Sequence, residues 1–147
     1  MIYEDRKPSP AEKKAKKTAG KVSKPEDLDP LILQTIPYEY PQRRIITELT
    51  TDEFTCLCPF SGLPDFAHLT IKYIPYRQLI ELKSLKYYLY SFRNVKIYNE
   101  HVVNRILEDL KKVLRPYEID VVGEFTSRGG MKNRVTACYK KIDKREL

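Results

Sequence analysis

The sequence lacks several features on which common classes of protein depend. It has no tryptophan, only two histidines, and no apolar run that approaches the length of a membrane-spanning helix. Charged residues begin at Glu4 and Asp5, so the N-terminus carries no apolar segment of the kind found in signal peptides. These absences predict a cytoplasmic protein that does not associate with membranes.

Cysteine is also scarce, with three residues at positions 56, 58 and 138. The number is odd and too low for a secreted scaffold held by disulfides, so we expect free thiols in a reducing compartment. Zinc would have to be held by Cys56, Cys58, His68 and His101, and no pair of these has the spacing typical of zinc ligands. The sequence therefore predicts no metal site and leaves the thiols available for other chemistry.

Positive charge is plentiful, but it is concentrated at the N-terminus. The formal net charge is +7, and residues 1–25 contribute +5 of it through eight basic and three acidic side chains. A folded nucleic-acid-binding protein more often carries its excess charge on the folded surface, so the pattern argues against nucleic acid as a partner. An RNA-binding module that uses the tail stays open as an alternative. Its stacking surface would be Tyr87, Tyr88 and Tyr90, although their helical spacing favours burial.

Composition divides the chain into three parts. Residues 1–25 are rich in Lys, Pro, Ala, Ser and Glu and poor in large apolar side chains, which predicts a flexible basic tail. Residues 26–43 predict an extended arm that packs on the domain or on a neighbouring subunit. Residues 44–147 are expected to form the single folded domain of a chain of this length. The apolar residues of the arm are Leu31, Ile32, Leu33, Ile36 and Tyr38.

Hydrophobic periodicity predicts the elements of the domain. We expect strands over residues 45–57, 68–73, 119–125 and 135–140, and loops at residues 61–65 and 127–130. We expect helices over residues 82–92 and 99–114, with Asn99 as the N-terminal cap of the second. This order predicts an α+β domain with both helices on one face of a four-stranded antiparallel sheet. Joining subunits edge to edge into barrels would close the two open edges of such a sheet.

The first segment suited to chemistry joins a thiol to a carboxyl group. Cys58 lies at a strand end and Asp65 follows a short Gly/Pro loop, so a nucleophile and a proton-carrying group could share one pocket. Each residue also has a plainer interpretation. A free cysteine is more often a small buried apolar residue, and an aspartate in a loop is more often a turn former.

Two further segments could bind ligands. Lys83 and Lys86 share a helix face, and Ser84 lies in the first turn, where free backbone N–H groups favour anions such as a cofactor phosphate. A solvated basic face has the same pattern. Glu100, at the start of the second helix, could accept two N–H bonds from a guanine-type ring, or could lie there only because of the helix dipole.

Taken together, the three segments resemble the QueF family, the NADPH-dependent 7-cyano-7-deazaguanine reductases, in its short single-module form. The resemblance runs from about Arg44 to Tyr139. One block matches the cofactor signature of the family, and three shorter motifs follow the family order. These segments are Glu81-Leu82-Lys83-Ser84-Leu85-Lys86-Tyr87-Tyr88, Leu57-Cys58-Pro59, Pro64-Asp65-Phe66 and Phe125-Thr126-Ser127-Arg128-Gly129-Gly130.

The resemblance implies a tunnelling fold (T-fold) and a ring-like homo-oligomer with active sites between subunits. It implies that Cys58 adds to the nitrile to give a covalent thioimide and that Asp65 protonates the nitrile nitrogen. NADPH then reduces the adduct to 7-aminomethyl-7-deazaguanine in queuosine tRNA-modification biosynthesis. The residues implied to bind the substrate are Ile80, Glu81, Leu82, Asn99 and Glu100, and those implied to bind NADPH are Lys83, Ser84, Lys86, Arg128 and Gly129.

The sequence departs from the family at two positions. Asn99 replaces the histidine that usually precedes the substrate glutamate, and Val102 replaces a cysteine that protects the nucleophile in some relatives. We interpret Cys56 and Cys138 as structural. Two alternatives remain within the fold: a purine- or pterin-handling enzyme related to GTP cyclohydrolases, and the amidinotransferase-like branch of the same family, which lacks the cofactor block.

Overall fold

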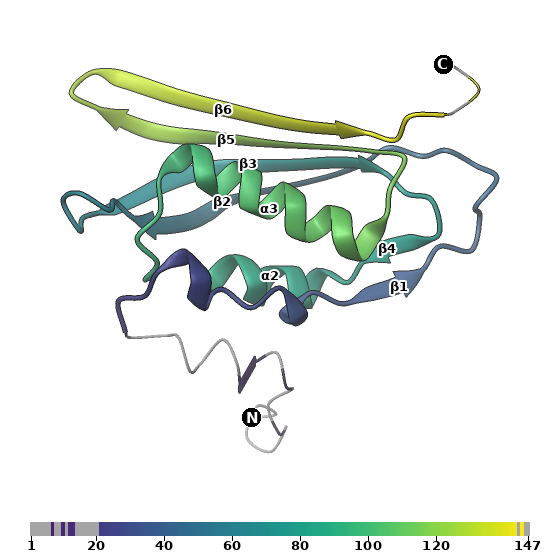
Figure 1. Ribbon diagram of the computed structural model, residues 1–147, viewed down its shortest axis with the longest axis horizontal. Coiled ribbons are helices and arrows are strands. Elements are labelled where there is room, and N and C mark those ends of the chain that lie inside the picture. Colours follow the sequence, from purple (N-terminus) through teal and green to yellow (C-terminus); the bar gives the residue numbers. More distant parts are fainter. Residues whose placement is uncertain (1–6, 8–9, 11, 14–20, 144, 146–147) are drawn as a thin grey trace, which may run out of the picture.

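The computed structural model describes residues 7, 10, 12–13, 21–143 and 145. Most of the predicted flexible tail lies outside these described residues. Figure 1 shows the arrangement of the elements. In chain order they are the 3₁₀ turns η1 (Pro25–Asp27) and η2 (Pro30–Ile32), the strands β1 (Thr35–Pro37), β2 (Thr47–Leu57), β3 (Pro64–Ile74) and β4 (Gln78–Ile80), the helices α2 (Leu82–Tyr90) and α3 (Asn99–Leu114), and the strands β5 (Glu118–Arg128) and β6 (Met131–Lys140).

The main sheet has four antiparallel strands in the order β2-β3-β5-β6. Helices α2 and α3 precede β5 in the chain and lie on the same face of this sheet (Figure 1). The predicted α+β class is therefore confirmed. The prediction missed β1 and β4, which pair with each other as a separate two-stranded antiparallel sheet. Each of these strands has three residues, too few for an alternating pattern to be recognised in the sequence.

The arm packs on its own chain. Leu28, Ile32 and Leu33 are buried in the core, whereas Leu31 and Ile36 are exposed. Only part of the predicted apolar set therefore packs inward. Two tight 3₁₀ turns, each begun by a proline, replace the fully extended path that the composition suggested.

A buried polar cluster joins the arm to both helices. Asp109 on α3 accepts hydrogen bonds from Tyr88 Oη at 2.7 Å and from Arg105 Nε at 2.8 Å. The other guanidinium nitrogens of Arg105 donate to the backbone carbonyls of Pro25 (3.0 Å) and Leu28 (3.2 Å). The charge of the buried carboxylate is therefore paired, and the same arginine satisfies two carbonyl groups of the arm.

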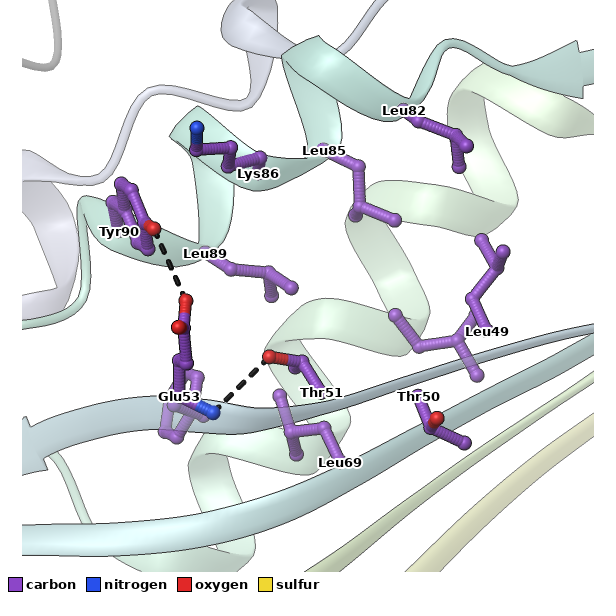
Figure 2. A pocket seen from close by; sticks show the side chains of 12 residues that line it. Leu49, Thr50, Thr51, Glu53, Leu69, Leu82, Leu85, Lys86, Leu89 and Tyr90 are labelled. Carbon is purple, nitrogen blue, oxygen red and sulfur yellow. Dashed lines mark hydrogen bonds between the residues drawn. The ribbon is translucent and has the colours of Figure 1, made fainter.

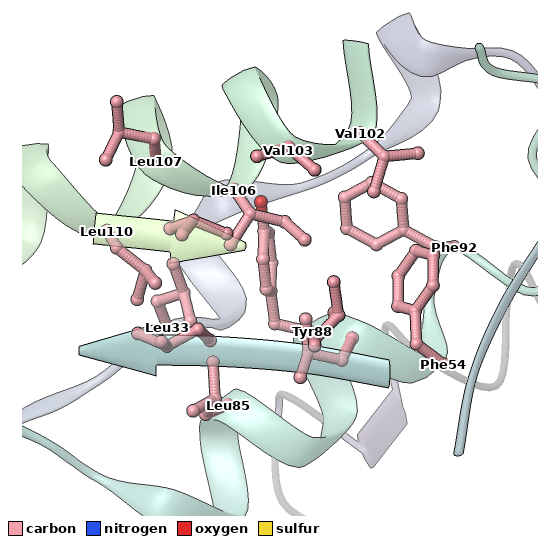
Figure 3. Packing of buried hydrophobic residues seen from close by; sticks show 14 of the residues in the cluster. Leu33, Phe54, Leu85, Tyr88, Phe92, Val102, Val103, Ile106, Leu107 and Leu110 are labelled. Carbon is pink, nitrogen blue, oxygen red and sulfur yellow. The ribbon is translucent and has the colours of Figure 1, made fainter. Parts of the chain in front are cut away.

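Helix α3 supplies the centre of the core, and its apolar side chains pack between the sheet and α2 (Figure 3). Burying each large side chain of this kind contributes about 1.5–3 kcal/mol. Gly123 on β5 allows the close approach, because a methyl group there would lie 2.9 Å from Val103 on α3 and 2.9 Å from Phe125. The buried residues of α3 include Val102, Val103, Ile106, Leu110 and Leu114.

The ends of α3 differ in part from the prediction. Asn99 is the first residue of the helix, and the N-cap position belongs to Tyr98, so the predicted capping role of Asn99 is wrong. The physical reason is that a cap residue has an extended backbone, which Tyr98 has and the helical Asn99 does not. The helix ends before Pro116 as expected, and the backbone of Arg115, its C-cap residue, is in the left-handed conformation (φ 46°).

Candidate active site

A β-bulge in β2 decides where Cys58 points. Thr51 pairs with Leu69, but Phe54 pairs with Ala67, so β2 contains one extra residue between these pairs. The extra residue shifts the alternation, and the side chains that face the helices change from odd to even positions. Phe54 and Cys56 are buried on this inner face. Cys58 follows Cys56 by two residues and therefore emerges on the same side.

The loop after β2 surrounds the Cys58 thiol with hydrogen-bond donors. The Cys58 N–H donates to Leu63 O at 2.8 Å, and the Gly62 N–H donates to Cys58 O at 2.9 Å. Hydrogen bonds from the Ser61 side chain, the backbone of Ser61 and Phe60, and the Arg128 side chain lower the pKa of Cys58 from 9.0 to about 7. A large fraction of this half-exposed thiol is therefore the nucleophilic thiolate at neutral pH.

The other two thiols are in different environments. Burial raises the pKa of Cys56 to about 12, which agrees with its predicted structural role. Cys138 is exposed on β6, so burial does not account for the structural role predicted for it. Its side chain points outward because β6 is an edge strand with alternating exposure, and a hydrogen bond to Asp120 raises its pKa. Cys58 is thus the one cysteine of the three that combines exposure with a lowered pKa.

Asp65 lies in the strand β3, and the predicted loop ends before it. It is opposite Cys56 in the β2–β3 register and faces inward, with 8% of its surface exposed. Its Oδ1 is 2.7 Å from Arg128 Nη2, and the same nitrogen donates to Pro64 O at 3.1 Å. The hydroxyl of Thr55 fixes the backbone of Asp65 by donating to its carbonyl at 2.8 Å. Asp65 is therefore held on the side of the sheet that carries Cys58.

A second bulge places Arg128 on this inner face. Phe125 pairs with Asn133 but Arg128 pairs with Met131, so two residues of β5 oppose one of β6. Arg128 consequently faces the same side as the buried Phe125. The predicted loop over residues 127–130 is a two-residue turn, in which Gly129 and Gly130 have φ values of 55° and 77°. Positive φ at both positions is typical of the turn that best matches the twist of a hairpin.

The start of α3 lies beside the same end of the sheet. Leu57 donates its N–H to Val95 O at 2.9 Å and accepts from Ile97 N–H at 3.0 Å, in a parallel bridge centred on Lys96. Because the two segments run in parallel, the residue after Leu57 and the residues that begin α3 emerge at the same edge. This pairing brings Asn99 and Glu100 to the end of the sheet that holds Cys58.

Asn99 and Glu100 present hydrogen-bond acceptors there. Asn99 Oδ1 is buried, and it has no hydrogen-bond partner among the described residues. Leaving such an acceptor unsatisfied costs about 1–3 kcal/mol, so the position favours a ligand that brings a donor. Glu100 is exposed, and its Oε1 accepts a hydrogen bond from Asn133 Nδ2 at 3.2 Å. Sequence reasoning missed Asn133, because its proximity to Glu100 depends on how α3 lies against β6.

Helix α2 begins in a way that the sequence did not predict. Glu81 is its N-cap and accepts hydrogen bonds from the backbone N–H groups of Lys83 (2.9 Å) and Ser84 (2.6 Å). Ser84 is buried, and its hydroxyl accepts from Gln34 N–H at 2.9 Å and donates to Glu81 O at 2.8 Å. The expectation that these N–H groups are free for an anion is therefore wrong, since the side chain of Glu81 already occupies them.

The two lysines of α2 have different surroundings. Lys83 Nζ lies 3.6 Å from Glu12 Oε1, and the Tyr87 hydroxyl donates to the same oxygen at 2.8 Å. Lys86 is exposed, and its Nζ lies 5.8 Å and 5.7 Å from the ring centres of Tyr87 and Tyr90. Tyr88 is fully buried while Tyr87 and Tyr90 are half-buried, so the predicted burial holds completely for Tyr88 alone.

Beside these lysines lies an open groove of about 570 Å³, here called the α2–β2 groove. Figure 2 shows leucine side chains of α2 facing those of the sheet across it, with Lys86 and Tyr90 at one end. Leu82 lines the groove and is 60% exposed. The residues that line it are Leu49, Thr50, Thr51, Glu53, Phe54, Leu69, Ile71, Leu82, Leu85, Lys86, Leu89 and Tyr90. Cys58, Asp65 and Glu100 are not among them.

The candidate site residues form two groups at opposite ends of the sheet. Cys58, Asp65 and Arg128 lie at one end, and the start of α3 is beside them. Ile80 lies at the other end, where its N–H donates to the hydroxyl of Tyr73 at 3.1 Å. Tyr73 is eight residues along β3 from Asp65, which corresponds to about 27 Å at about 3.4 Å per residue. One chain therefore does not bring the segment Ile80–Leu82 to Cys58.

Two further findings concern metal binding and membrane-spanning helices in the described part of the chain. The described residues contain no group of three or more His, Cys, Asp or Glu side chains that could hold a metal ion. Within the same residues, every helix is too short or too polar to cross a membrane.

Comparison with known proteins identifies close relatives. The family model described as QueF-like protein matches residues 64–144. A protein of Caldicellulosiruptor bescii named NADPH-dependent 7-cyano-7-deazaguanine reductase is 55% identical over 116 residues, which cover 79% of this chain and 88% of that protein. A protein of the same name from Caldanaerobacter subterraneus subsp. tengcongensis is 53% identical over 79% of this chain and 87% of its own.

A solved structure supports the fold assignment. The apo form of the archaeosine synthase QueF-Like superposes with a TM-score of 0.62, covering 67% of this chain and 96% of that one. The sequence identity between the two is 22%, so this likeness concerns the fold alone.

Proposed function

This chain belongs to the QueF-like family, and we propose that it catalyses the reaction for which its relatives are named, the NADPH-dependent reduction of 7-cyano-7-deazaguanine to 7-aminomethyl-7-deazaguanine. The observation that carries the proposal is the Cys58 thiol, whose lowered pKa of about 7 coincides with a buried carboxylate, Asp65, on the same face of the sheet. A nitrile carbon is a mild electrophile, and a thiolate with a nearby proton carrier is suited to attack it.

In the first step Cys58 adds to the nitrile. The sulfur forms a bond to the nitrile carbon as one π bond of the nitrile breaks, and its electron pair moves to the nitrogen. Asp65 transfers to that nitrogen the proton that the thiol gives up, or one from solvent where Cys58 is already a thiolate, which leaves a neutral thioimide on Cys58. Proton transfer by a positioned group of this kind typically contributes about 10²–10⁴-fold to a rate. Two molecules of NADPH, bound in turn, would supply the two hydrides of the reduction. Cys58 departs as a thiolate between them, and a second proton from solvent completes the amine.

Recognition of the substrate is assigned to the start of α3. The carboxylate of Glu100 can accept N–H bonds from the edge of a deazaguanine ring, and the unpartnered Asn99 Oδ1 can accept another. Asn99 cannot carry a proton as a histidine could, so proton transfer is assigned to Asp65 alone. Where subunit assembly buries a site of this type, it rejects analogues that lack the matching donors by about 10⁴-fold.

The cofactor is assigned to α2 and its surroundings. Lys83 and Lys86 offer two ammonium groups for phosphates, and the apolar α2–β2 groove with Tyr90 beside it suits a flat ring. The buried Ser84 supports this site indirectly, by holding the arm through Gln34. Arg128 and Gly129 belong to the Cys58 end of the sheet, so they can meet the same cofactor only across a subunit boundary.

The separation of the two groups supports a T-fold oligomer with active sites between subunits. The segment Ile80–Leu82, which we propose to line the substrate, lies too far from Cys58 in one chain. The two open edges of the sheet carry opposite charges, and β2 pairing with β6 of the next copy would be antiparallel and could close a ring. The charged residues are Glu48, Asp52 and Glu53 on β2 and Lys132, Arg134 and Lys140 on β6.

The decisive experiment follows NADPH oxidation by the purified protein with 7-cyano-7-deazaguanine. We expect about two NADPH oxidised per nitrile consumed, in keeping with a two-hydride reduction, and no oxidation by Cys58→Ala. Cys138→Ala is the matched control, because it removes an exposed thiol that lies outside the proposed site. A covalent nitrile adduct without NADPH oxidation would instead favour the amidinotransferase-like chemistry. Absence of both in a correctly assembled sample would disprove the proposed function.

A further inference from the structure

The position of Arg128 is built by three local features of the hairpin. The bulge in β5 turns the side chain to the inner face, the Gly129-Gly130 turn ends the strand at once, and Arg128 pairs with Met131. Its guanidinium is therefore attached to the rigid end of a hairpin rather than to a long loop.

The Arg128 side chain reaches across to the neighbouring strand β3 and contacts Asp65, the carboxyl group of the site. Nη2 lies 2.7 Å from Asp65 Oδ1 and donates to Pro64 O at 3.1 Å. The guanidinium also lowers the pKa of Cys58, by less than Ser61 and the Phe60 backbone do. One planar cation thus contacts the carboxylate and the backbone of its strand, and acts on the thiol. A guanidinium is suited to this because it presents five donors in a fixed fork.

The charges explain why a cation is needed there. Asp65 from β3 raises the pKa of Cys56 and Arg128 from β5 lowers it, and Arg128 also lowers the pKa of Cys58. A thiolate at Cys58 and a carboxylate at Asp65 on the same face of the sheet would repel each other, which disfavours the charged thiol. Arg128 pairs with the carboxylate of Asp65 and favours the thiolate, so it offsets this repulsion.

We propose that Arg128 is a positioning residue for nitrile addition, which holds the Asp65 carboxylate and the Cys58 sulfur together before any cofactor is present. This inference rests on the proposed function and assigns Arg128 to an earlier step than cofactor binding. In that step Asp65 passes a proton, given up by the Cys58 thiol or taken from solvent where Cys58 is a thiolate, to the nitrile nitrogen as the C–S bond forms and a C–N π bond breaks. Arg128 gives up no proton, and no oxidant or reductant takes part.

Because addition needs no NADPH, the two possible roles of Arg128 can be separated. Full-length wild type, Arg128→Gln and Arg128→Lys are mixed with 7-cyano-7-deazaguanine alone, and the covalent adduct is followed by intact mass across the neutral and alkaline pH range. In parallel, the alkylation rate of Cys58 by iodoacetamide is measured over the same range. Arg145→Gln is the control, since it removes an exposed arginine–aspartate pair at the far end of β6.

We expect Arg128→Gln to slow adduct formation at neutral pH by about fivefold if the thiol titration moves upward by one unit from about 7, and by about tenfold for each further unit. The alkylation midpoint should move to higher pH, and Arg128→Lys should restore the charge but only part of the addition rate, because it lacks the fork. Circular dichroism and the oligomeric state check that the variants are folded and assembled.

The proposal is overturned if Arg128→Gln forms the adduct at the wild-type rate and is impaired only in its KM for NADPH. It is also overturned if the alkylation midpoint of Cys58 does not move, a result that does not depend on nitrile chemistry. Failure of wild type to form any adduct, combined with a shifted alkylation midpoint, would instead remove the proposed function and leave the effect of Arg128 on the thiol standing.

Discussion

The carboxylate of Glu12 lies 3.6 Å from the ammonium group of Lys83, which joins the N-terminal segment to the helix that carries the proposed cofactor lysines. Glu12 is 8% exposed, and the hydroxyl of Tyr87 donates to it at 2.8 Å. Further along, Ser23 anchors the same segment by donating its N–H to Asn94 O at 2.8 Å and accepting from Lys96 N–H at 2.9 Å. A carboxylate of the chain itself thus pairs with the Lys83 ammonium group, to which we have assigned a phosphate of NADPH.

Replacing Glu12 with Gln is therefore expected to lower the KM for NADPH, because the phosphate no longer competes with a carboxylate for Lys83. An ion pair of this partly exposed kind is worth about 0.2–1 kcal/mol, which corresponds to a change of about 1.4- to 5-fold. Steady-state kinetics at saturating nitrile measures the change. Adduct formation without NADPH should be unaffected, and Glu26→Gln, an exposed acidic residue in η1, serves as the control. An unchanged or higher KM would contradict the competition.

Cys58 should react far faster with iodoacetamide at neutral pH than either other cysteine. Its pKa of about 7 means that the alkylation rate should reach half its maximum near pH 7, whereas an ordinary thiol at 9.0 would do so two units higher. Cys56 should stay unmodified in the folded protein, since burial raises its pKa to about 12. Peptide mass mapping after limited alkylation gives the rate at each site. Preferential labelling of Cys138, which is exposed, would show that accessibility outweighs the thiolate fraction.

The charges on the two sheet edges make the proposed assembly testable. The substitutions Lys132→Glu and Arg134→Glu reverse the charge of the β6 edge and place negative charge on both edges of the sheet. We therefore expect the oligomer to dissociate and reductase activity to fall. Adding Glu48→Lys and Glu53→Lys to the same chain restores opposite charges and should restore assembly. Sedimentation velocity at low and high salt measures both effects, because salt screens such contacts. Normal assembly of the first variant would rule out pairing of β2 with β6.

Tyr88→Phe tests the buried cluster that joins the arm to the helices. The Tyr88 hydroxyl donates to Asp109 at 2.7 Å, and its loss leaves a buried acceptor with one donor fewer, so we expect the free energy of unfolding to fall by about 1–3 kcal/mol. Urea denaturation at neutral pH measures this change. Tyr139→Phe, on the half-buried face of β6, is the control and should have a smaller effect.

The same tyrosine predicts a dependence of stability on alkaline pH. Burial, followed by the nearby Asp109, raises the pKa of Tyr88 well above 10.0 in the folded protein. Above pH 10 the unfolded chain therefore loses this proton while the folded chain keeps it, and stability must fall as pH rises. The Tyr88→Phe variant should show a shallower decline than wild type. An equally steep decline in both proteins would assign the effect to other groups.

The sequence by itself determined the main elements and the identities of the chemical groups. Alternation and helical periodicity depend on near neighbours in the chain, and they predicted the four long strands and the two helices to within a few residues. The motifs around Cys58, Asp65 and Lys83–Lys86 were visible for the same reason, since each is a short run of contiguous residues. The resemblance to the QueF family drew on these local runs alone.

Only the tertiary structure decided how these groups face one another. The bulges in β2 and β5, each a single extra residue without a recognisable sequence signature, turn Cys58 and Arg128 to the inner face. The role of Ser84 as an anchor for Gln34 depends on a contact between residues 50 positions apart. The exposure of Cys138 and the contact of Asn133 with Glu100 depend on β6 being an edge strand beside α3. Such features are set by register and packing between distant segments, which local periodicity does not encode.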